Sequence, residues 1–270
     1  MDPEEFRRHG HGSMDRHAGN RDRLPALAAA AADSLGYGGT HHGRTDAAMI
    51  LYGRRAQALA WLLAAVAGYV DATGFALIGG YFVSFMSGNS TRLGIDAAAG
   101  SGGAGLAGAL IGAFLAGVIA GALVAQAVRV RRASAVLMLT ALLLAGAAAL
   151  AEAAAPSLLI ACAMAAAMGA INNVFERNGE VSIGLTYMTG SLVKLGQRIA
   201  TACTGRDRLG WLPYLGLWLG FVAGVAAAAV GYPLVGLRAL WGASLLLAVL
   251  AILTGFAAPG AESDRPRKPS

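Results

Sequence analysis

The polar residues that could carry chemistry in this chain lie inside long apolar stretches. Asp71 is near the middle of one such stretch, where a carboxylate costs roughly 2.5–3.5 kcal/mol on membrane-insertion scales. A residue kept at that cost usually faces the protein interior and has a partner. The residue type fits a proton or cation site, and it equally fits an N-cap or an interhelical hydrogen bond that holds two halves in register.

A polar, glycine-containing motif occurs twice, 102 residues apart and without a gap: residues 82–94 (FVSFMSGNSTRLG) and residues 184–196 (GLTYMTGSLVKLG). Four positions are identical and four others change like for like, among them Arg92 to Lys194. At the same spacing Asp71 corresponds to Asn173. The motif therefore indicates an internal duplication, and we expect Asp71 to lie close to its candidate partners Asn172, Asn173 and Arg177.

The composition of residues 87–91 (SGNST) and 189–191 (TGS) is typical of a helix N-cap, and so of a helix N-terminus that follows a break. Such an N-terminus carries partial positive charge and free N–H groups, and Arg92 or Lys194 follows about one turn later. These features suit an anionic or carboxylate-bearing solute. In the alternative, both motifs are interfacial amphipathic helices whose cations reach lipid headgroups. The predicted substrate site comprises Asp71, Ser87, Gly88, Asn89, Arg92, Asn173, Thr189, Gly190, Ser191 and Lys194.

The elements that must position these residues are membrane helices. Of the 270 residues 56% are hydrophobic and 13% charged, against a usual charged share of roughly 25%. A helix needs about 20 apolar residues to cross a bilayer. We predict an all-α membrane bundle with a broken or re-entrant helix in each motif and six spans: 57–80, 105–128, 133–152, 157–175, 211–231 and 235–256.

Three spans in each half is an odd number, so the two halves must enter the membrane from opposite sides. This predicts a 3+3 inverted repeat, with repeat 1 at residues 49–154 and repeat 2 at residues 155–257. The second and fifth spans share a ladder of small residues four apart, which aligns Gly108, Gly112 and Ala116 with Gly216, Gly220 and Gly224 at a spacing of 108. This pattern lets helices approach closely in lipid. We therefore expect those two spans to be partners, although the same pattern could serve a homo-oligomer.

The placement of arginine and lysine predicts the orientation. With both termini in the cytoplasm, Arg92 and Arg238 are the only cations between the tails that fall outside, and the other loop cations fall inside. Residues 1–48, which contain all five histidines, and residues 258–270 are predicted to be disordered cytoplasmic tails. We expect a multi-pass protein of the inner membrane.

Several function classes find no support in the sequence. The charge of +6 belongs to tails and short loops, which argues against nucleic acid. Residues 57–256 contain no histidine, and the two cysteines form no metal spacing. Ser87 lacks a neighbouring base of the kind that a nucleophile needs. We therefore predict neither catalysis nor a cofactor nor a metal.

The motifs resemble those of the YoaK-like family of bacterial membrane proteins, a domain-of-unknown-function family. The resemblance rests on residues 67–72 (AGYVDA), 82–89 (FVSFMSGN), 172–173 (NN), 186–190 (TYMTG) and 195–196 (LG), and covers about residues 55–256. The family usually has threonine where this chain has Ser87, a change that keeps the hydroxyl. The resemblance implies a bacterial inner-membrane protein of about six spans and names no substrate.

Two functions stay open on the sequence. The first is a small-solute transporter, for an anionic solute and with proton coupling, whose site lies between the two repeats. The second is a membrane scaffold, sensor or partner subunit whose motifs only hold the halves together. Because the transporter interpretation rests on shared architecture, it is partly an analogy.

Overall fold

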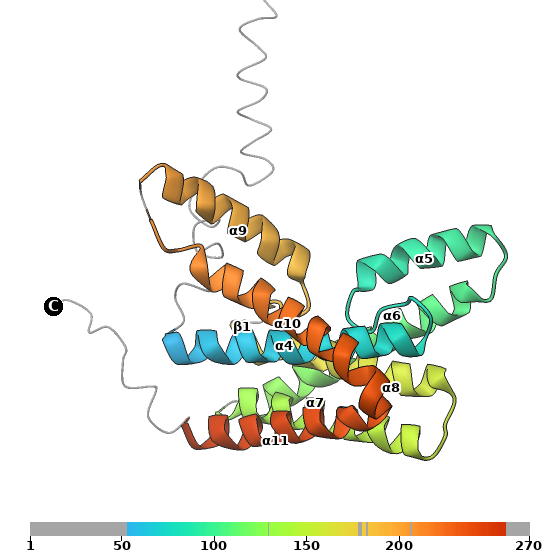
Figure 1. Cartoon of the computed structure of the whole chain (residues 1–270). Helices are drawn as coiled ribbons and strands as arrows, with labels where there is room; N and C mark the ends of the chain where they lie inside the picture. The colour runs from blue at the N-terminus through green and yellow to red at the C-terminus, as the bar shows by residue number, and fades with distance from the viewer. Residues whose placement is uncertain (1–52, 129, 178–179, 182, 206, 258–270) are drawn as a thin grey trace, which may run out of the picture. The chain divides into compact units, whose positions relative to one another are not determined.

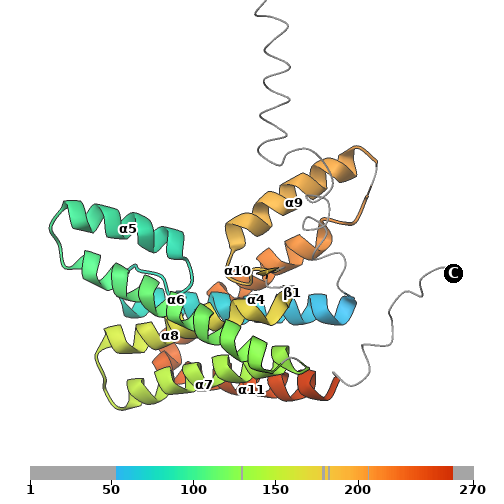
Figure 2. The ribbon, with the colours of Figure 1, turned by 180° about the vertical axis from the view of Figure 1, so that it is seen from behind.

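The apolar runs of the sequence form helices in the computed structural model, which describes residues 53–128, 130–177, 180–181, 183–205 and 207–257 (Figures 1 and 2). The predicted tails, residues 1–48 and 258–270, lie outside the described residues. The elements are α4 (Arg54–Leu77), α5 (Met86–Ala98), α6 (Gly103–Ala127), α7 (Arg132–Glu152), α8 (Ser157–Ile171), η1 (Asn172–Phe175), β1 (Glu176–Arg177), β2 (Glu180–Val181), α9 (Met188–Cys203), α10 (Leu212–Val235), η2 (Gly236–Arg238) and α11 (Ala239–Ala257).

Five stretches of the described chain are long and apolar enough to cross a membrane. The last of them, Leu212–Phe256, contains both α10 and α11. The prediction of a helical, multi-pass membrane protein is thus confirmed, with β1 and β2 forming only a small antiparallel hairpin. The break between the last two helices is not at residues 232–234, between the predicted spans 211–231 and 235–256. Instead α10 continues past Pro233 and ends where Gly236 takes a φ of 58°.

The two short helices, α5 and α9, begin inside the two duplicated motifs. With 13 and 16 residues they are shorter than a helix that crosses a bilayer. Each follows an irregular segment, so the predicted break is present in both motifs. Figures 1 and 2 show that α5 and α9 begin near one another and run outward in opposite directions.

The long helices form three contacting pairs: α4 packs on α10, α6 packs on α8, and α7 packs on α11. The prediction that the second and fifth spans, α6 and α10, are partners is wrong. The glycines of α6 that allow close approach lie against α8, and those of α10 lie against α4. Gly112 on α6, one of the predicted ladder residues, has no neighbour within 4 Å of the position that a Cβ would take.

The contact between α4 and α10 is made backbone to backbone. A Cβ at Gly68 would overlap the carbonyl oxygen of Phe221, and a Cβ at Gly224 would overlap the carbonyl oxygen of Ala65. Trp61 on α4 also donates from Nε1 to the Pro213 carbonyl at 3.0 Å. Any side chain at these two glycines would push the helices apart.

The contact between α6 and α8 repeats this arrangement. A Cβ at Gly169 would overlap the carbonyl oxygen of Phe114, and one at Gly117 would overlap that of Ala166. Gly169 follows Gly68 by 101 residues, and Gly224 follows Gly117 by 107. The predicted ladder alignment, which matched Gly224 with Ala116 at a spacing of 108, is therefore wrong by one residue.

Two reciprocal hydrogen bonds join α7 to α11. Ser134 donates to the carbonyl of Ala251 at 2.6 Å, and Ser244 donates to that of Ala141 at 2.7 Å. The two donors, Ser134 and Ser244, are 110 residues apart in the sequence, and so are the two acceptors, Ala141 and Ala251. Because the early part of each helix meets the later part of the other, α7 and α11 are antiparallel.

We predict that Gly117→Ala lowers the thermal unfolding midpoint of the purified protein in detergent. The new methyl group must displace the α8 backbone, and overpacking of this kind costs about 1–3 kcal/mol. The matched control is Gly112→Ala on the same helix, where the space is open and the higher helix propensity of alanine makes the change neutral or stabilising. Equal midpoints for the two variants would contradict the close α6–α8 contact.

Candidate functional site

Asp71 binds the backbone of the first motif. Its Oδ1 atom accepts hydrogen bonds from the N–H groups of Val83 at 3.0 Å and Ser84 at 2.7 Å, and the residue is buried. Both N–H groups belong to the irregular segment before α5, where no helix or sheet ladder can satisfy them. Asp71 therefore fastens the first motif to α4.

Asn172 binds the second motif in the equivalent way. Its Oδ1 accepts from the Thr186 N–H at 3.3 Å, and its Nδ2 donates to the Thr186 hydroxyl at 3.0 Å. Asp71 and Asn172 each follow by three residues the glycine, Gly68 or Gly169, that touches the other half. The counterpart of Asp71 is thus Asn172. The two copies are 101 residues apart in the helix before the motif, as Gly68 and Gly169 show, but 102 residues apart in the motif itself.

The predicted pairing of Asp71 with Asn173 is wrong. Asn173 is buried, and its Nδ2 donates to the carbonyls of Val118 and Ala170, both at 3.2 Å. It also lies against Gly121, where a Cβ would come within 2.6 Å of Nδ2. Asn173 therefore ties the end of α8 to α6.

Two other predicted site residues, Gly88 and Asn89, shape the first turn of α5. Asn89 is fully buried and binds one residue twice: Oδ1 accepts from the Phe82 N–H at 2.9 Å, and Nδ2 donates to the Phe82 carbonyl at 2.6 Å. A Cβ at Gly88 would come within 2.5 Å of the Phe85 ring. These residues fold the segment back on itself and let the ring lie on the helix.

Gly190 and Ser191 occupy the corresponding positions in α9. The Tyr187 ring lies over Gly190, where a Cβ would overlap it, just as the Phe85 ring lies over Gly88. Ser191 is buried and donates to the Tyr187 carbonyl at 3.4 Å. Each motif thus presents one aromatic ring at the start of its helix.

Neither helix begins where the sequence suggested. The residues at the N-cap positions are Phe85 for α5 and Tyr187 for α9, and neither makes a side-chain capping bond. Ser87 and Thr189 lie in the first turn instead, so their predicted capping role is wrong. The N–H groups of the first turn precede the first i to i−4 bond of each helix and point out of its N-terminus.

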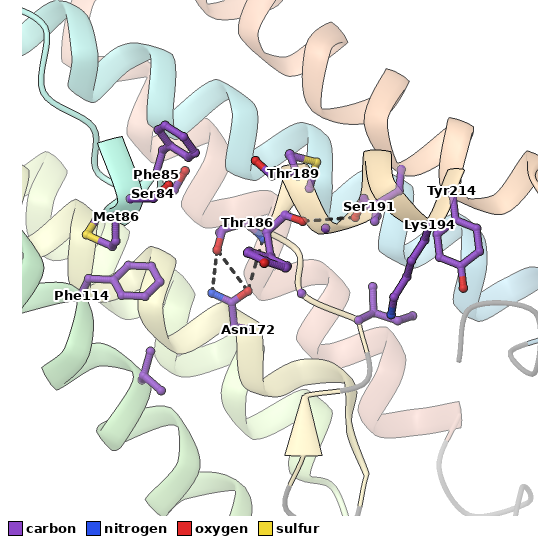
Figure 3. Close-up of a pocket in the computed structure, with 18 residues that line it drawn as sticks. Ser84, Phe85, Met86, Phe114, Asn172, Thr186, Thr189, Ser191, Lys194 and Tyr214 are labelled. Carbon is purple, nitrogen blue, oxygen red and sulfur yellow. Dashed lines mark hydrogen bonds between the residues drawn. The ribbon is translucent and has the colours of Figure 1, made fainter. Parts of the chain in front are cut away.

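The first turns of α5 and α9 border one pocket of about 790 Å³ (Figure 3). Phe114 and Val118, from the middle of α6, form another part of its wall. The pocket therefore lies at mid-height of a helix long enough to cross the membrane. Its described lining comprises Ser84–Ser87, Phe114, Val118, Asn172, Ile183, Gly184, Thr186–Ser191, Lys194, Tyr214 and Leu217.

Half of the predicted site residues line this pocket. They are Ser87, Thr189, Gly190, Ser191 and Lys194. The others lie behind the pocket wall or away from it: Asp71, Gly88, Asn89, Arg92 and Asn173. The second motif thus contributes more to the lining than the first.

The two motif cations have different surroundings, although the sequence aligns them. Lys194 is half-buried in the pocket. Arg92 is exposed, with its guanidinium carbon 4.9 Å from the centre of the Tyr81 ring. Tyr81 in turn donates to Asp96 Oδ2 at 2.7 Å. Arg92 therefore does not line this pocket, and Lys194 is the one motif cation that does.

Ser84 places a buried hydroxyl at the pocket wall. Its Oγ lies beside the Asp71 carboxylate but does not meet the geometry of a hydrogen bond to any atom of the described residues. Buried polar atoms nearly always have a partner from the protein or from ordered water.

Comparison with known proteins identifies the family. A protein-family model described as "Protein of unknown function (DUF1275)" matches residues 59–253. The chain belongs to the DUF1275 family. A "UPF0700 transmembrane protein" of Rhizobium meliloti (strain 1021) is 36% identical over 193 residues, which cover 72% of this chain and 83% of the relative. No solved structure matches. The resemblance to the YoaK-like family is confirmed, and the matched residues of this DUF1275 chain span α4 to most of α11.

The aromatic residues of the DUF1275 pocket were not predicted from the sequence. Phe85 and Tyr187 occupy equivalent positions of the duplicated motif, a signal that could have drawn attention to them. Phe114 and Tyr214 look like ordinary aromatic residues of membrane helices, and nothing in their local sequence indicates a pocket. Asn172 was not included in the predicted substrate site, because its neighbour Asn173 matched Asp71 at the spacing of the motif.

We predict that Asp71→Asn leaves the fold nearly as stable as the wild type, whereas Asp71→Ala lowers the unfolding midpoint. An amide oxygen can accept the same two N–H bonds, as Asn172 does for Thr186. Alanine leaves two buried N–H groups unpaired, at a cost of about 1–3 kcal/mol each. Thermal unfolding in detergent measures both, and equal losses for the two variants would contradict the backbone-anchoring role.

Proposed function

We propose that this protein is a small-solute transporter whose solute site is the pocket between α5 and α9. The observation that carries the proposal is that both duplicated motifs begin their short helices at one pocket, at the level of the middle of α6. Irregular backbone at membrane depth is tolerated where it is buried in protein or lines a water-filled cavity. Broken helices that converge on a site near the midplane are also the architecture of secondary transporters.

In the proposed architecture the chain has six spans, α4, α6 and α7 in one half and α8, α10 and α11 in the other, related by an inverted repeat. The antiparallel contact of α7 with α11 supports it, because those helices occupy equivalent places in the two halves. In Figure 1, α4 and α8 also run in opposite directions. A pseudo-two-fold axis between the halves gives each motif access to the same pocket from opposite sides.

The arrangement in the cell follows from the loop charges. We place the protein in the bacterial inner membrane with both termini in the cytoplasm, since this puts most loop cations inside. The turn after α5 then lies outside and the turn after α9 lies inside. Alternating access would open the pocket to each side in turn.

The chemistry of the pocket favours an anionic solute. Lys194 carries the only full charge among the described lining residues, and the hydroxyls of Ser87 and Thr189 are close to the start of their helices. The free N–H groups of the first turn of α9 add partial positive charge. We propose no catalytic step.

Asp71 is the candidate for proton coupling. It is a carboxylate buried inside a membrane helix, directly beneath the Ser84 segment that lines the pocket. Intramembrane carboxylates often relay protons in transporters. Gain or loss of a proton at Asp71 would change the bonds that hold Ser84 in place.

A membrane scaffold or sensor is the second candidate function, and one observation favours it. Asp71, Asn89 and Asn173 all bind backbone atoms of the protein, as residues that only hold two halves together would. The two functions differ in whether the pocket contains water and opens to both sides of the membrane.

We predict that a thiol in the pocket reacts with water-soluble, membrane-impermeant methanethiosulfonate reagents. The test places Ser87→Cys or Thr189→Cys in a background in which Cys162 and Cys203 are serine. Both positions line the pocket and are exposed. In a transporter with alternating access, each thiol reacts in sealed vesicles of either orientation.

The matched control is Leu115→Cys on α6, whose side chain is exposed on the outer surface of a membrane helix and should meet lipid. It should react slowly from both sides. Pocket thiols that are as unreactive as this control would favour the scaffold over the transporter.

We predict that Asp71→Asn abolishes proton uptake while the fold survives. The amide keeps the structural bonds but cannot carry a proton, so the variant separates the two roles. The measurement uses proteoliposomes with an internal pH-sensitive dye and a solute chosen by ligand-induced thermal stabilisation. Unaltered proton uptake by the variant would rule out Asp71 as the coupling residue.

A further inference from the structure

The pocket between α5 and α9 has two chemically different ends. In Figure 3 the side chains of Phe85, Met86 and Phe114 lie on one side, and those of Lys194 and Tyr214 lie on the other. Asn172 and Thr186 are between the two groups, with their polar atoms bonded to each other. A solute that fills the pocket therefore meets apolar surface at one end and a cation at the other.

The charged end favours one negative charge. Lys194 is the one cation of the described lining, and no acidic side chain belongs to that lining. The corresponding cation of the first motif, Arg92, is held outside on the ring of Tyr81. A solute with two full negative charges would leave one without a partner, and buried charges need partners.

The apolar end favours a hydrophobic body of substantial size. A Cβ at position 88 would overlap the Phe85 ring, so glycine there leaves room for the ring at the start of α5. Phe85 lines the pocket and is 39% exposed. Phe114 from α6 adds a second ring to the same end. Aromatic side chains bury large apolar area in ligand sites, and a small inorganic anion would gain nothing from them.

We propose that the solute class of this pocket is an amphipathic organic monoanion, a single carboxylate joined to an aromatic or aliphatic body. This inference rests on the proposed solute site and names its substrate. The carboxylate binds Lys194 and the free N–H groups at the start of α9. The body packs against Phe85, Met86 and Phe114. At about 790 Å³ the pocket is within the usual range for sites of small organic ligands.

The test is ligand-induced thermal stabilisation of the purified full-length protein in detergent, with 4-phenylbutyrate as the probe. Its concentration dependence gives the affinity, because a ligand that binds the folded state stabilises it by mass action. Three analogues of the probe test its charge and its ring separately: 4-phenylbutanamide lacks the charge, 4-phenylbutylamine reverses it, and butyrate lacks the ring. Phosphate represents inorganic anions, and phosphatidylglycerol in mixed micelles represents an anionic lipid.

The decisive variants are Lys194→Gln and its matched control Arg92→Gln, which removes the aligned cation outside the pocket. We expect 4-phenylbutyrate to stabilise the wild type and Arg92→Gln equally, and Lys194→Gln to weaken its affinity about tenfold or more, since a charge-assisted hydrogen bond is lost. Phe85→Ala should weaken 4-phenylbutyrate and leave the much weaker effect of butyrate unchanged. All variants meet the same micelle, so partitioning of the probe into detergent cancels.

Stabilisation by the amine, by phosphate or by phosphatidylglycerol in place of 4-phenylbutyrate would overturn the proposed class. Equal losses of affinity in Lys194→Gln and Arg92→Gln would also overturn it. If 4-phenylbutyrate binds in a Lys194-dependent way but shows no flux in proteoliposomes, the ligand class is supported and only the transport proposal is contradicted. Flux of a different solute through the pocket, without binding of the probe, would support transport and reject the class.

Discussion

Two backbone-to-backbone helix contacts set the geometry of this protein. Gly68 and Gly224 bring α4 and α10 together, and Gly169 and Gly117 do the same for α8 and α6. In lipid there is little hydrophobic drive between helices, so close packing of small residues must hold them. Because each contact joins the first helix of one half to a later helix of the other, neither half is complete alone. The contacts also place the residue three positions after Gly68 or Gly169 beneath a motif.

Most of the polar side chains at this interface serve the backbone. The segments before α5 and α9 have no ladder of their own, and unpaired N–H and C=O groups are costly inside a membrane. Asp71, Asn89 and Asn172 supply partners for them, while Asn173 joins α8 to α6. Fewer polar side chains line the pocket, and among the described lining residues Lys194 is the charged one. The division between anchoring and lining residues is the basis of both functional proposals.

Sequence patterns predict the helical membrane fold, the two breaks and the duplicated motif well, because hydropathy and small polar residues report local requirements. They do not predict which residue lies opposite which. Asn173 matched Asp71 by spacing, yet Asn172 does the equivalent work, since one residue is gained between the helix and the motif. Likewise Arg92 and Lys194 align in sequence, but the ring of Tyr81, a residue before the motif, draws Arg92 away. Such outcomes depend on neighbours in space, which a single sequence does not report.

The proposed transporter requires that two halves of opposite orientation bring equivalent motifs to one pocket. It is tested most directly by the side of the membrane on which α5 and α9 end. Cys203, at the end of α9, is exposed and serves as a probe once Cys162 is serine. Ser101→Cys, just after α5, serves as the other probe in a background in which both native cysteines are serine. With an impermeant maleimide on intact spheroplasts, we predict that the thiol introduced by Ser101→Cys reacts and that Cys203 reacts only after lysis. Labelling of both from the same side would contradict it.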